Sequence, residues 1–381
     1  MTQPFRVAVP QAALDDLARR LKSTRWPEAS PREGWSQGTE LAYLKDLVDY
    51  WRAGFDWRRE EARLNSRVQF IAPVSGMTLH FIHERSPHPG ARPLLLIHGW
   101  PGGIHEFHRL IPMLTRPEQH GGDPRDAFHV VAPSLPGYGY SDPFPGAGGN
   151  PRQFGRVFHS LMTETLGYSR YGAQGGDWGA VIASWMGMDH ADSLPGIHLN
   201  MAGLRPNPPR DAVFTPEEQA YLAGIPAQRA EELGYMALQG SRPQTLAYAL
   251  MDSPAGLAGW LVEKYRAWSD CGGDVERAIS RDDLLTLITL YWVTGSIASS
   301  MRLYYEFRVS KERLPPGGRV QCPTGCADFP KEFLRAPRAW VERAYNIVHW
   351  TPMPRGGHFA ALEAPELLAA DIRAFFRSAW R

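Results

Sequence analysis

The chain has 381 residues, of which 43% are hydrophobic and 21% are charged, and its formal net charge at pH 7 is +1. These values are typical of a globular protein that is long enough for one large core and an additional subdomain. The balanced charge excludes any argument for a nucleic-acid or anionic-membrane partner.

The sequence contains no sign of export or of a structural metal. No uninterrupted apolar run reaches membrane-spanning length, and the first residues, Met1 to Arg6, lack the apolar region of a signal peptide. Three cysteines in a chain of this length predict no disulfide framework. Cys322 and Cys326 have no His or further Cys pair nearby to complete a zinc site. We therefore expect a soluble, cytoplasmic protein without a metal or another cofactor.

Residues 1–65 are helical and aromatic in character, with two apolar periodicities separated by a proline-rich link. Both faces are too small to form a core of their own, so we expect this segment to pack on the main domain. The apolar positions are Leu14, Leu17 and Leu21 in the first helix, and Leu41, Leu44, Val48 and Trp51 in the second.

Residues 66–203 alternate between short apolar runs and helical periodicity. Strands interleaved with helices predict an α/β fold with a mostly parallel sheet that is covered on both faces. The predicted strands are Val68–Ala72, Met77–His83, Pro93–Ile97 and His129–Ala132, and the predicted helices are Ile104–Leu114 and Phe154–Leu166.

A glycine-rich loop, His98–Gly103, follows the third of these strands. Ligands in open α/β sheets bind at the carboxyl ends of parallel strands, where this loop is expected. Its backbone could turn the N–H of Trp100 inward as an oxyanion donor. A phosphate cradle is disfavoured, because the Lys and Ser/Thr of a P-loop are missing.

The pentapeptide Gly175–Gly179 carries the strongest catalytic signal. The preceding residues, Ser169–Gln174, are typical of a strand, and the following ones, Ala180–Met188, are typical of a helix. This is the context of a nucleophile elbow, in which the central residue of G-x-Nu-x-G occupies a strained turn. Here the central residue is Asp177, which is already an anion at neutral pH and could attack carbon directly to form an ester. The alternative is that Asp177 only caps the helix.

In such an elbow the N–H of Trp178, the residue after the nucleophile, would join that of Trp100 to form an oxyanion hole. A carboxylate nucleophile suits strained ethers and carbon–halogen bonds. It does not suit peptides or carboxylic esters.

Two other patterns resemble catalytic motifs without the required context. Gly34–Gly38 matches the serine version of the elbow but has no strand before it, so we interpret it as chance. His105 and His108 miss the spacing of a metalloprotease site by one residue, and we expect them on a helix surface.

Residues 204–312 have purely helical periodicity and interrupt the α/β alternation, which predicts a lid inserted over the sheet. Prolines mark its beginning near Pro206 and its end near Pro315. Asp282 and Asp283 open a long helix in it. A lid above a carboxylate would exclude water and shape an apolar pocket.

Residues 313–381 resume the α/β pattern, with strands at Arg319–Cys322 and Tyr345–Trp350 and a final helix at Pro365–Phe376. His358 lies in a glycine-rich loop after the last strand, where an α/β-hydrolase places its general base. We expect its imidazole to be neutral near pH 7, so that it can take a proton from water. The base needs an acid to orient it. Both Asp328 and Glu332 follow the first of these strands, and their positions do not decide between them.

Several segments together resemble the microsomal-type epoxide hydrolases of the α/β-hydrolase superfamily, and the resemblance covers nearly the whole chain. The segments are Arg25-Trp26-Pro27, His98–Gly102, Gly175–Gly179, Gly234-Tyr235-Met236, Leu290–Gly295, Pro323-Thr324-Gly325, Phe329–Glu332 and Arg355–Phe359.

The resemblance implies an α/β-hydrolase fold and a cofactor-independent epoxide hydrolase. Its aspartyl ester would be hydrolysed by water that His358 activates. The resemblance also implies that Glu332 is the acid and that Tyr235 and Tyr304 in the lid donate to the epoxide oxygen. The chain looks like the soluble bacterial branch, some members of which serve natural-product pathways such as enediyne assembly. Trp292, with Trp100 and Trp178, indicates a bulky apolar or aryl epoxide as the small-molecule substrate.

Two other functions remain open at this stage. A haloalkane or haloacetate dehalogenase uses the same aspartate nucleophile, but it has no use for a pair of lid tyrosines. A non-catalytic binding protein could retain the fold, because fold does not imply activity. The sequence also leaves a homodimer open.

Overall fold

Nine strands form one mixed sheet in the computed structural model, which describes residues 1–380. Their order is β1-β2-β3-β5-β4-β6-β7-β8-β9, with antiparallel pairing from β1 to β5 and parallel pairing from β5 to β9. The strands are β1 (Gln3–Phe5), β2 (Gln69–Val74), β3 (Met77–Glu84), β4 (Arg92–Ile97), β5 (Phe128–Pro133), β6 (Gly172–Gly175), β7 (Ile197–Leu199), β8 (Val320–Asp328) and β9 (Tyr345–Pro352).

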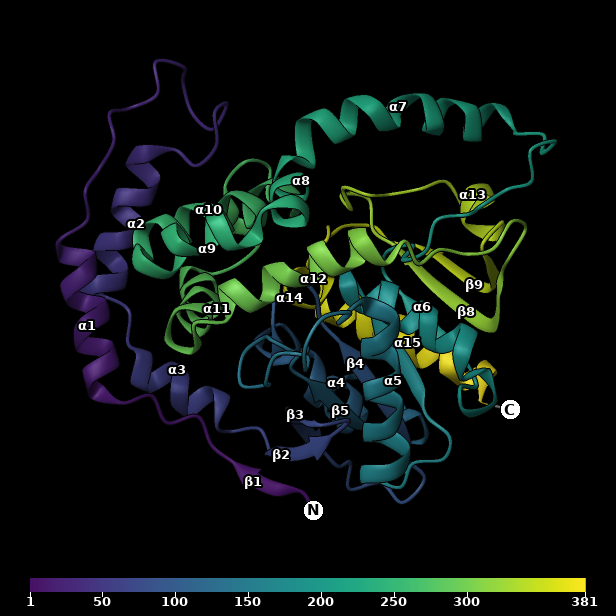
Figure 1. Cartoon of the computed structure of the whole chain (residues 1–381). Helices are drawn as coiled ribbons and strands as arrows, with labels where there is room; N and C mark the ends of the chain where they lie inside the picture. The colour runs from purple at the N-terminus through teal and green to yellow at the C-terminus, as the bar shows by residue number, and fades with distance from the viewer. Residues whose placement is uncertain (381) are drawn as a thin grey trace.

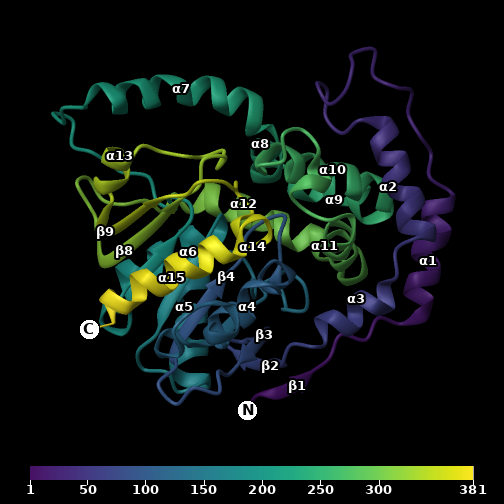
Figure 2. The same ribbon diagram turned by 180° about the vertical axis from the view of Figure 1, so that it is seen from behind.

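Helices cover both faces of this sheet (Figures 1 and 2). One face carries α5 (Pro151–Ser160) and α6 (Trp178–Asp189), and the other carries α4 (Leu110–Thr115) and α15 (Pro365–Ala379). The apolar run Leu94–Ile97 in β4 is fully buried, as expected for a parallel strand covered on both sides. The predicted α/β-hydrolase architecture is confirmed.

Some predicted elements differ in extent. The expected helix Ile104–Leu114 is a short 3-10 turn, Ile104–Phe107, followed by α4. The helix expected at Phe154–Leu166 starts three residues earlier and ends in a π-helical turn, Leu161–Thr165. Strand β8 extends to Asp328 because register shifts near Pro323 absorb a proline and a glycine that usually end a strand.

The helices of the N-terminal segment pack mainly on the lid and not, as the sequence predicted, on the main domain. The segment consists of α1 (Gln11–Lys22), α2 (Leu41–Ala53), α3 (Trp57–Leu64) and β1, a strand that the periodicity did not predict. Trp51 donates its indole N–H to Thr289 Oγ1 at 3.0 Å, and Arg63 pairs with Asp283 at 2.9 Å. The helices of this segment therefore stabilise the lid, while β1 extends the sheet by pairing with β2.

Most helices of the lid lie between α1 and α2 on one side and the sheet on the other (Figures 1 and 2). The lid contains α7 (Pro216–Glu232), α8 (Gly234–Ser241), α9 (Pro243–Asp252), α10 (Pro254–Trp268), α11 (Arg281–Thr294) and α12 (Ser296–Ser310). Helix α7 extends over β8, β9 and α13 (Arg338–Glu342), while the short α14 (Ala360–Glu363) precedes α15. Within residues 1–380, no single helix is long and apolar enough to cross a membrane, and only α11 and α12 pass that test as a pair, bent by 90°.

Candidate active site

Asp177 occupies a sharp turn between β6 and α6. Its φ of 49° and ψ of −128° are unusual for a residue with a side chain, and such a conformation costs roughly 1–3 kcal/mol. The turn requires glycine on both sides. A Cβ on Gly175 would lie 2.3 Å from the backbone of Gly179, and one on Gly179 would lie 1.9 Å from the carbonyl oxygen of Ile97. This close packing of strand on helix forces the carboxylate outward.

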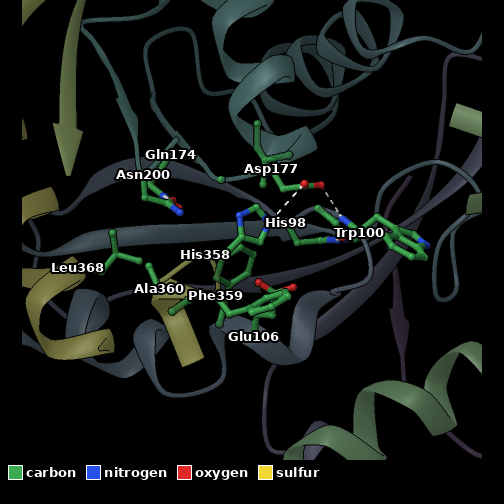
Figure 3. A pocket seen from close by; sticks show the side chains of 15 residues that line it. His98, Trp100, Glu106, Gln174, Asp177, Asn200, His358, Phe359, Ala360 and Leu368 are labelled. Carbon is green, nitrogen blue, oxygen red and sulfur yellow. Dashed lines mark hydrogen bonds and ion pairs between the residues drawn. The ribbon is translucent and has the colours of Figure 1, made fainter. Parts of the chain in front are cut away.

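The His98–Gly103 loop surrounds this carboxylate. The N–H of Trp100 donates to Asp177 Oδ1 at 2.8 Å (Figure 3). Trp178 is the first residue of α6, where backbone N–H groups have no acceptor within the helix. A Cβ on Gly99 would lie 2.3 Å from the Asp177 side chain, so the loop can come this close only because residue 99 is glycine. Both residues predicted to form an oxyanion hole therefore adjoin the carboxylate.

His358 lies between two carboxylates. Its Nε2 is 3.4 Å from Asp177 Oδ2, and its Nδ1 is 2.8 Å from Glu332 Oε2. Burial lowers the pKa of His358, but the charge of Glu332 and the hydrogen bond with Asp177 outweigh burial and raise the pKa to about 10. The imidazole is therefore protonated in the free protein, whereas we had expected a neutral ring near pH 7.

The alternative acid, Asp328, points elsewhere. Its two oxygens accept from Arg335 at 2.6 and 2.8 Å. Glu332 is buried, and its second oxygen accepts from the backbone N–H of Leu334 at 2.9 Å, which fixes the carboxylate toward His358. The geometry thus selects Glu332, a choice that position in the chain could not make.

The two lid tyrosines meet above Trp100. Tyr235, at the start of α8, stacks on the Trp100 ring with centroids 5.3 Å apart, and Tyr304, on α12, contacts the Trp178 ring at 4.8 Å. The rings of Tyr235 and Tyr304 are 5.7 Å apart. The neighbouring Tyr305 is 37% exposed, whereas Tyr304 is only 2% exposed.

Both tyrosine hydroxyls are ready to donate. Burial, and then the charge of Asp177 or of the neighbouring phenol, raises the pKa of Tyr235 and of Tyr304 well above 10, so both remain protonated. The hydroxyl of Tyr304 is buried and has no hydrogen-bond partner. A buried orphan hydroxyl is costly, and a ligand oxygen would satisfy it.

Sequence reasoning missed several residues that line a small cavity beneath Asp177 and His358 (Figure 3). The cavity has a volume of about 20 Å³, which is enough for a water molecule. Three of its polar side chains were not predicted: Glu106, Gln174 and Asn200. Glu106 accepts from the N–H of Gly103 at 3.0 Å, and burial raises its pKa to about 8. No motif marks these residues, because they converge only through folding.

Two further lid tyrosines support the oxyanion loop and were also missed. Tyr265 on α10 donates to the carbonyl of Pro101 at 2.8 Å, and Tyr291 on α11 donates to the carbonyl of Gly102 at 2.9 Å. Both side chains are fully or almost fully buried. The lid thus holds the loop that donates to Asp177.

Other predicted residues lie outside this cluster. Trp292, expected to bind substrate, is half-buried at the end of α11, with the Arg20 guanidinium 5.7 Å above its ring. Ser36 lies exposed in a turn with no strand before it. The expectation that His105 lies on the surface is wrong, because it is buried and its Nε2 is 2.7 Å from Asp283. Within residues 1–380, no three His, Cys, Asp or Glu side chains are arranged to hold a metal ion.

This fold, with an acidic nucleophile between a strand and a helix and a histidine–carboxylate pair beside it, defines an α/β-hydrolase. A family model described as "Epoxide hydrolase N terminus" matches residues 2–107, and one described as "alpha/beta hydrolase fold" matches residues 92–234.

Individual relatives match over the full length. Epoxide hydrolase 1 of Sus scrofa is 38% identical over 98% of this chain and 88% of its own. A Stigmatella aurantiaca protein that carries an epoxide hydrolase name is 47% identical over 98% of this chain and 84% of its own. The structure of Aspergillus niger epoxide hydrolase superposes with a TM-score of 0.86 at 31% identity, covering 100% of this chain and 97% of that one. The structure of juvenile hormone epoxide hydrolase from the silkworm Bombyx mori superposes with a TM-score of 0.86 at 32% identity, covering 100% of this chain and 94% of that one. The chain therefore belongs to the microsomal-type epoxide hydrolase family, and it is an epoxide hydrolase.

Proposed function

We propose that the enzyme opens epoxides through a covalent ester on Asp177. Oδ1 is held by the Trp100 N–H, which leaves Oδ2 to attack an epoxide carbon. The C–O bond of the ring breaks, and the oxygen takes a proton from Tyr235 or Tyr304. The observation that carries this proposal is the buried, unpartnered hydroxyl of Tyr304, whose ring lies 5.7 Å from that of Tyr235, because an alkoxide needs such donors as it forms.

Hydrolysis of the ester then needs His358 as a base. In the free enzyme the ionised Asp177 helps to raise the pKa of His358. Esterification removes that charge, so the pKa of His358 falls and its proton passes to the tyrosinate that ring opening leaves behind. The neutral imidazole then accepts a proton from water, and the hydroxide attacks Asp177 Cγ while the N–H groups of Trp100 and Trp178 stabilise the oxyanion. His358 returns this proton to the oxygen of the departing diol and recovers its own from the new carboxyl group of Asp177. His358 can therefore act as a base only after the ester has formed.

The walls around the tyrosines suggest the substrate class. Aromatic side chains from the core and the lid surround Tyr235 and Tyr304: Trp100, Trp178 and Trp268. Large apolar surfaces favour bulky apolar or aryl groups, which pack against rings in offset or edge-to-face geometry. The proposed substrate is therefore a bulky apolar or aryl epoxide.

Isotope transfer from water tests the covalent route. The enzyme is allowed one turnover of an aryl epoxide such as styrene oxide in H₂¹⁸O, and both product and protein are analysed by mass spectrometry. The expected result is an unlabelled diol together with one ¹⁸O in the peptide that contains Asp177, because the diol takes its oxygen from the carboxylate. Label in the first diol would instead mean that water attacks the epoxide directly.

Tyr235→Phe and Tyr304→Phe are each expected to slow ester formation by about 10²-fold, which is the usual cost of losing one oxyanion donor. The rate of ester hydrolysis should hardly change, because the phenols act on the leaving oxygen in the first step. Stopped-flow measurement of the intrinsic tryptophan fluorescence in single turnovers separates the two rates. Tyr305→Phe is the matched control, and an equal loss in that variant would contradict the assignment.

Glu332→Gln is expected to slow ester hydrolysis by up to about 10⁴-fold, because an amide cannot hold the imidazolium that forms. Asp328→Asn should have little effect, since Asp328 pairs with Arg335 and does not contact His358. Steady-state kcat of both variants checks the assignment. A large loss of kcat in Asp328→Asn with no loss in Glu332→Gln would instead assign the role of the acid to Asp328.

A further inference from the structure

The loop that carries His358 is fastened through its backbone amides. The N–H of Gly356 donates to Asp270 Oδ2, the N–H of His358 donates to the carbonyl of Trp268, and the N–H of Phe359 donates to Glu363 Oε1, each at 2.9 Å. Trp268 ends α10, and Asp270 follows it. Two of the three acceptors therefore belong to the lid, not to the sheet that carries the loop.

Glu363 uses both of its oxygens in this arrangement. Oε1 accepts from Phe359, next to the catalytic base, and Oε2 accepts from the N–H of Asp270 in the lid at 2.6 Å. Burial raises the pKa of Glu363 to about 7, although the amides of Asp270 and Phe359 oppose the shift. A carboxylate this far from water is held by the amides that it accepts from.

The same lid segment touches the reacting side chains. The ring of Trp268 lies 5.2 Å from that of His358 and 5.1 Å from that of Tyr235. The backbone contact leaves no spare room, since a Cβ on Gly357 would lie 2.6 Å from the carbonyl oxygen of Trp268. A shift of this segment would therefore displace the base and a proton donor together.

We propose that Asp270 and Glu363 are positioning residues that clamp the histidine loop to the lid and so place His358 for the second half-reaction. This inference rests on the proposed role of His358 as the base. The two residues differ in the number of hydrogen bonds that they accept. Asp270 accepts one hydrogen bond from the loop, so a neutral amide oxygen suffices there. Glu363 must accept from two N–H groups, and a glutamine would turn its own NH₂ toward one of them.

The test measures ester formation and ester hydrolysis separately, in single turnovers of styrene oxide with rapid quenching and intact-protein mass spectrometry. Glu363→Gln and Asp270→Ala are expected to slow hydrolysis on the order of 10²-fold while formation changes less than about threefold, because a small misplacement of the base suffices. The ester should therefore accumulate. Asp270→Asn should recover most of the lost rate, but Glu363→Gln should not.

Glu366→Gln is the matched control, because Glu366 pairs with the Arg355 side chain of the same loop without contacting its amides. Equal losses in formation and hydrolysis, or unchanged hydrolysis in Glu363→Gln with melting temperatures near that of the parent enzyme, would overturn the clamp. If His358→Gln accumulates ester and Glu363→Gln does not, only this inference fails. If neither variant nor the parent enzyme ever carries ester, the proposed function itself fails.

Discussion

Asp177→Asn is expected to reduce kcat for epoxide hydrolysis by about 10⁴-fold or more, which is the scale of losing a catalytic nucleophile. The amide keeps the size of the side chain and the hydrogen bond from Trp100, but it has no charged oxygen to attack carbon. No mass adduct should appear on the variant, even after prolonged incubation with an aryl epoxide. Steady-state assays and intact mass spectrometry measure the two outcomes.

A folded variant is needed to interpret that loss. Asparagine tolerates positive φ about as well as aspartate, so the strained turn should persist and the melting temperature should stay close to that of the parent enzyme. If instead Asp177→Asn retains substantial turnover while its amide stays intact, water would attack the epoxide directly, and the covalent mechanism would be wrong.

His358→Gln is expected to trap the ester. Ester formation needs only the Asp177 carboxylate and the lid phenols, so it should continue, whereas hydrolysis should slow by about 10²–10⁴-fold without the base. The protein mass should rise by the mass of one substrate molecule and then return slowly. Peptide mapping should place the added mass on Asp177.

The double variant Asp177→Asn/His358→Gln provides the control, since it removes the attachment point and should stay unmodified. Modification of the double variant would show that the adduct forms elsewhere. Absence of any adduct on His358→Gln, with the fold intact, would contradict the two-step scheme.

The pKa of His358 sets the order of the two steps. We expected a base that is neutral at pH 7, but Glu332 and Asp177 hold the proton on the ring in the free enzyme. That effect requires the Glu332 carboxylate at 2.8 Å from Nδ1 of the ring and the Asp177 carboxylate at 3.4 Å from Nε2. In the chain, Glu332 precedes His358 by 26 residues and Asp177 precedes it by 181. Such distances depend on three separate loops meeting, which residue spacing in the chain does not specify.

The lid illustrates the same limit. Its helical periodicity predicted an inserted lid, because the apolar spacing is a local property of each helix. That Tyr265, Tyr291, Trp268 and Asp270 of the lid hold the oxyanion loop and the histidine loop could not be predicted. Those contacts join elements more than 80 residues apart and follow from the packing of the lid on the sheet.

The sequence by itself determined the fold class and predicted the nucleophile. Alternating strand and helix patterns specify a covered parallel sheet, and Asp177 is recognisable because its strand, its glycines and its helix are contiguous in the chain. Tertiary structure alone decided between Asp328 and Glu332. It also raised the pKa of His358, left the Tyr304 hydroxyl unpartnered and joined Glu363 to the lid. The physical reason is that charge and hydrogen-bond energies fall off within a few ångströms, so they are set by which side chains meet after folding.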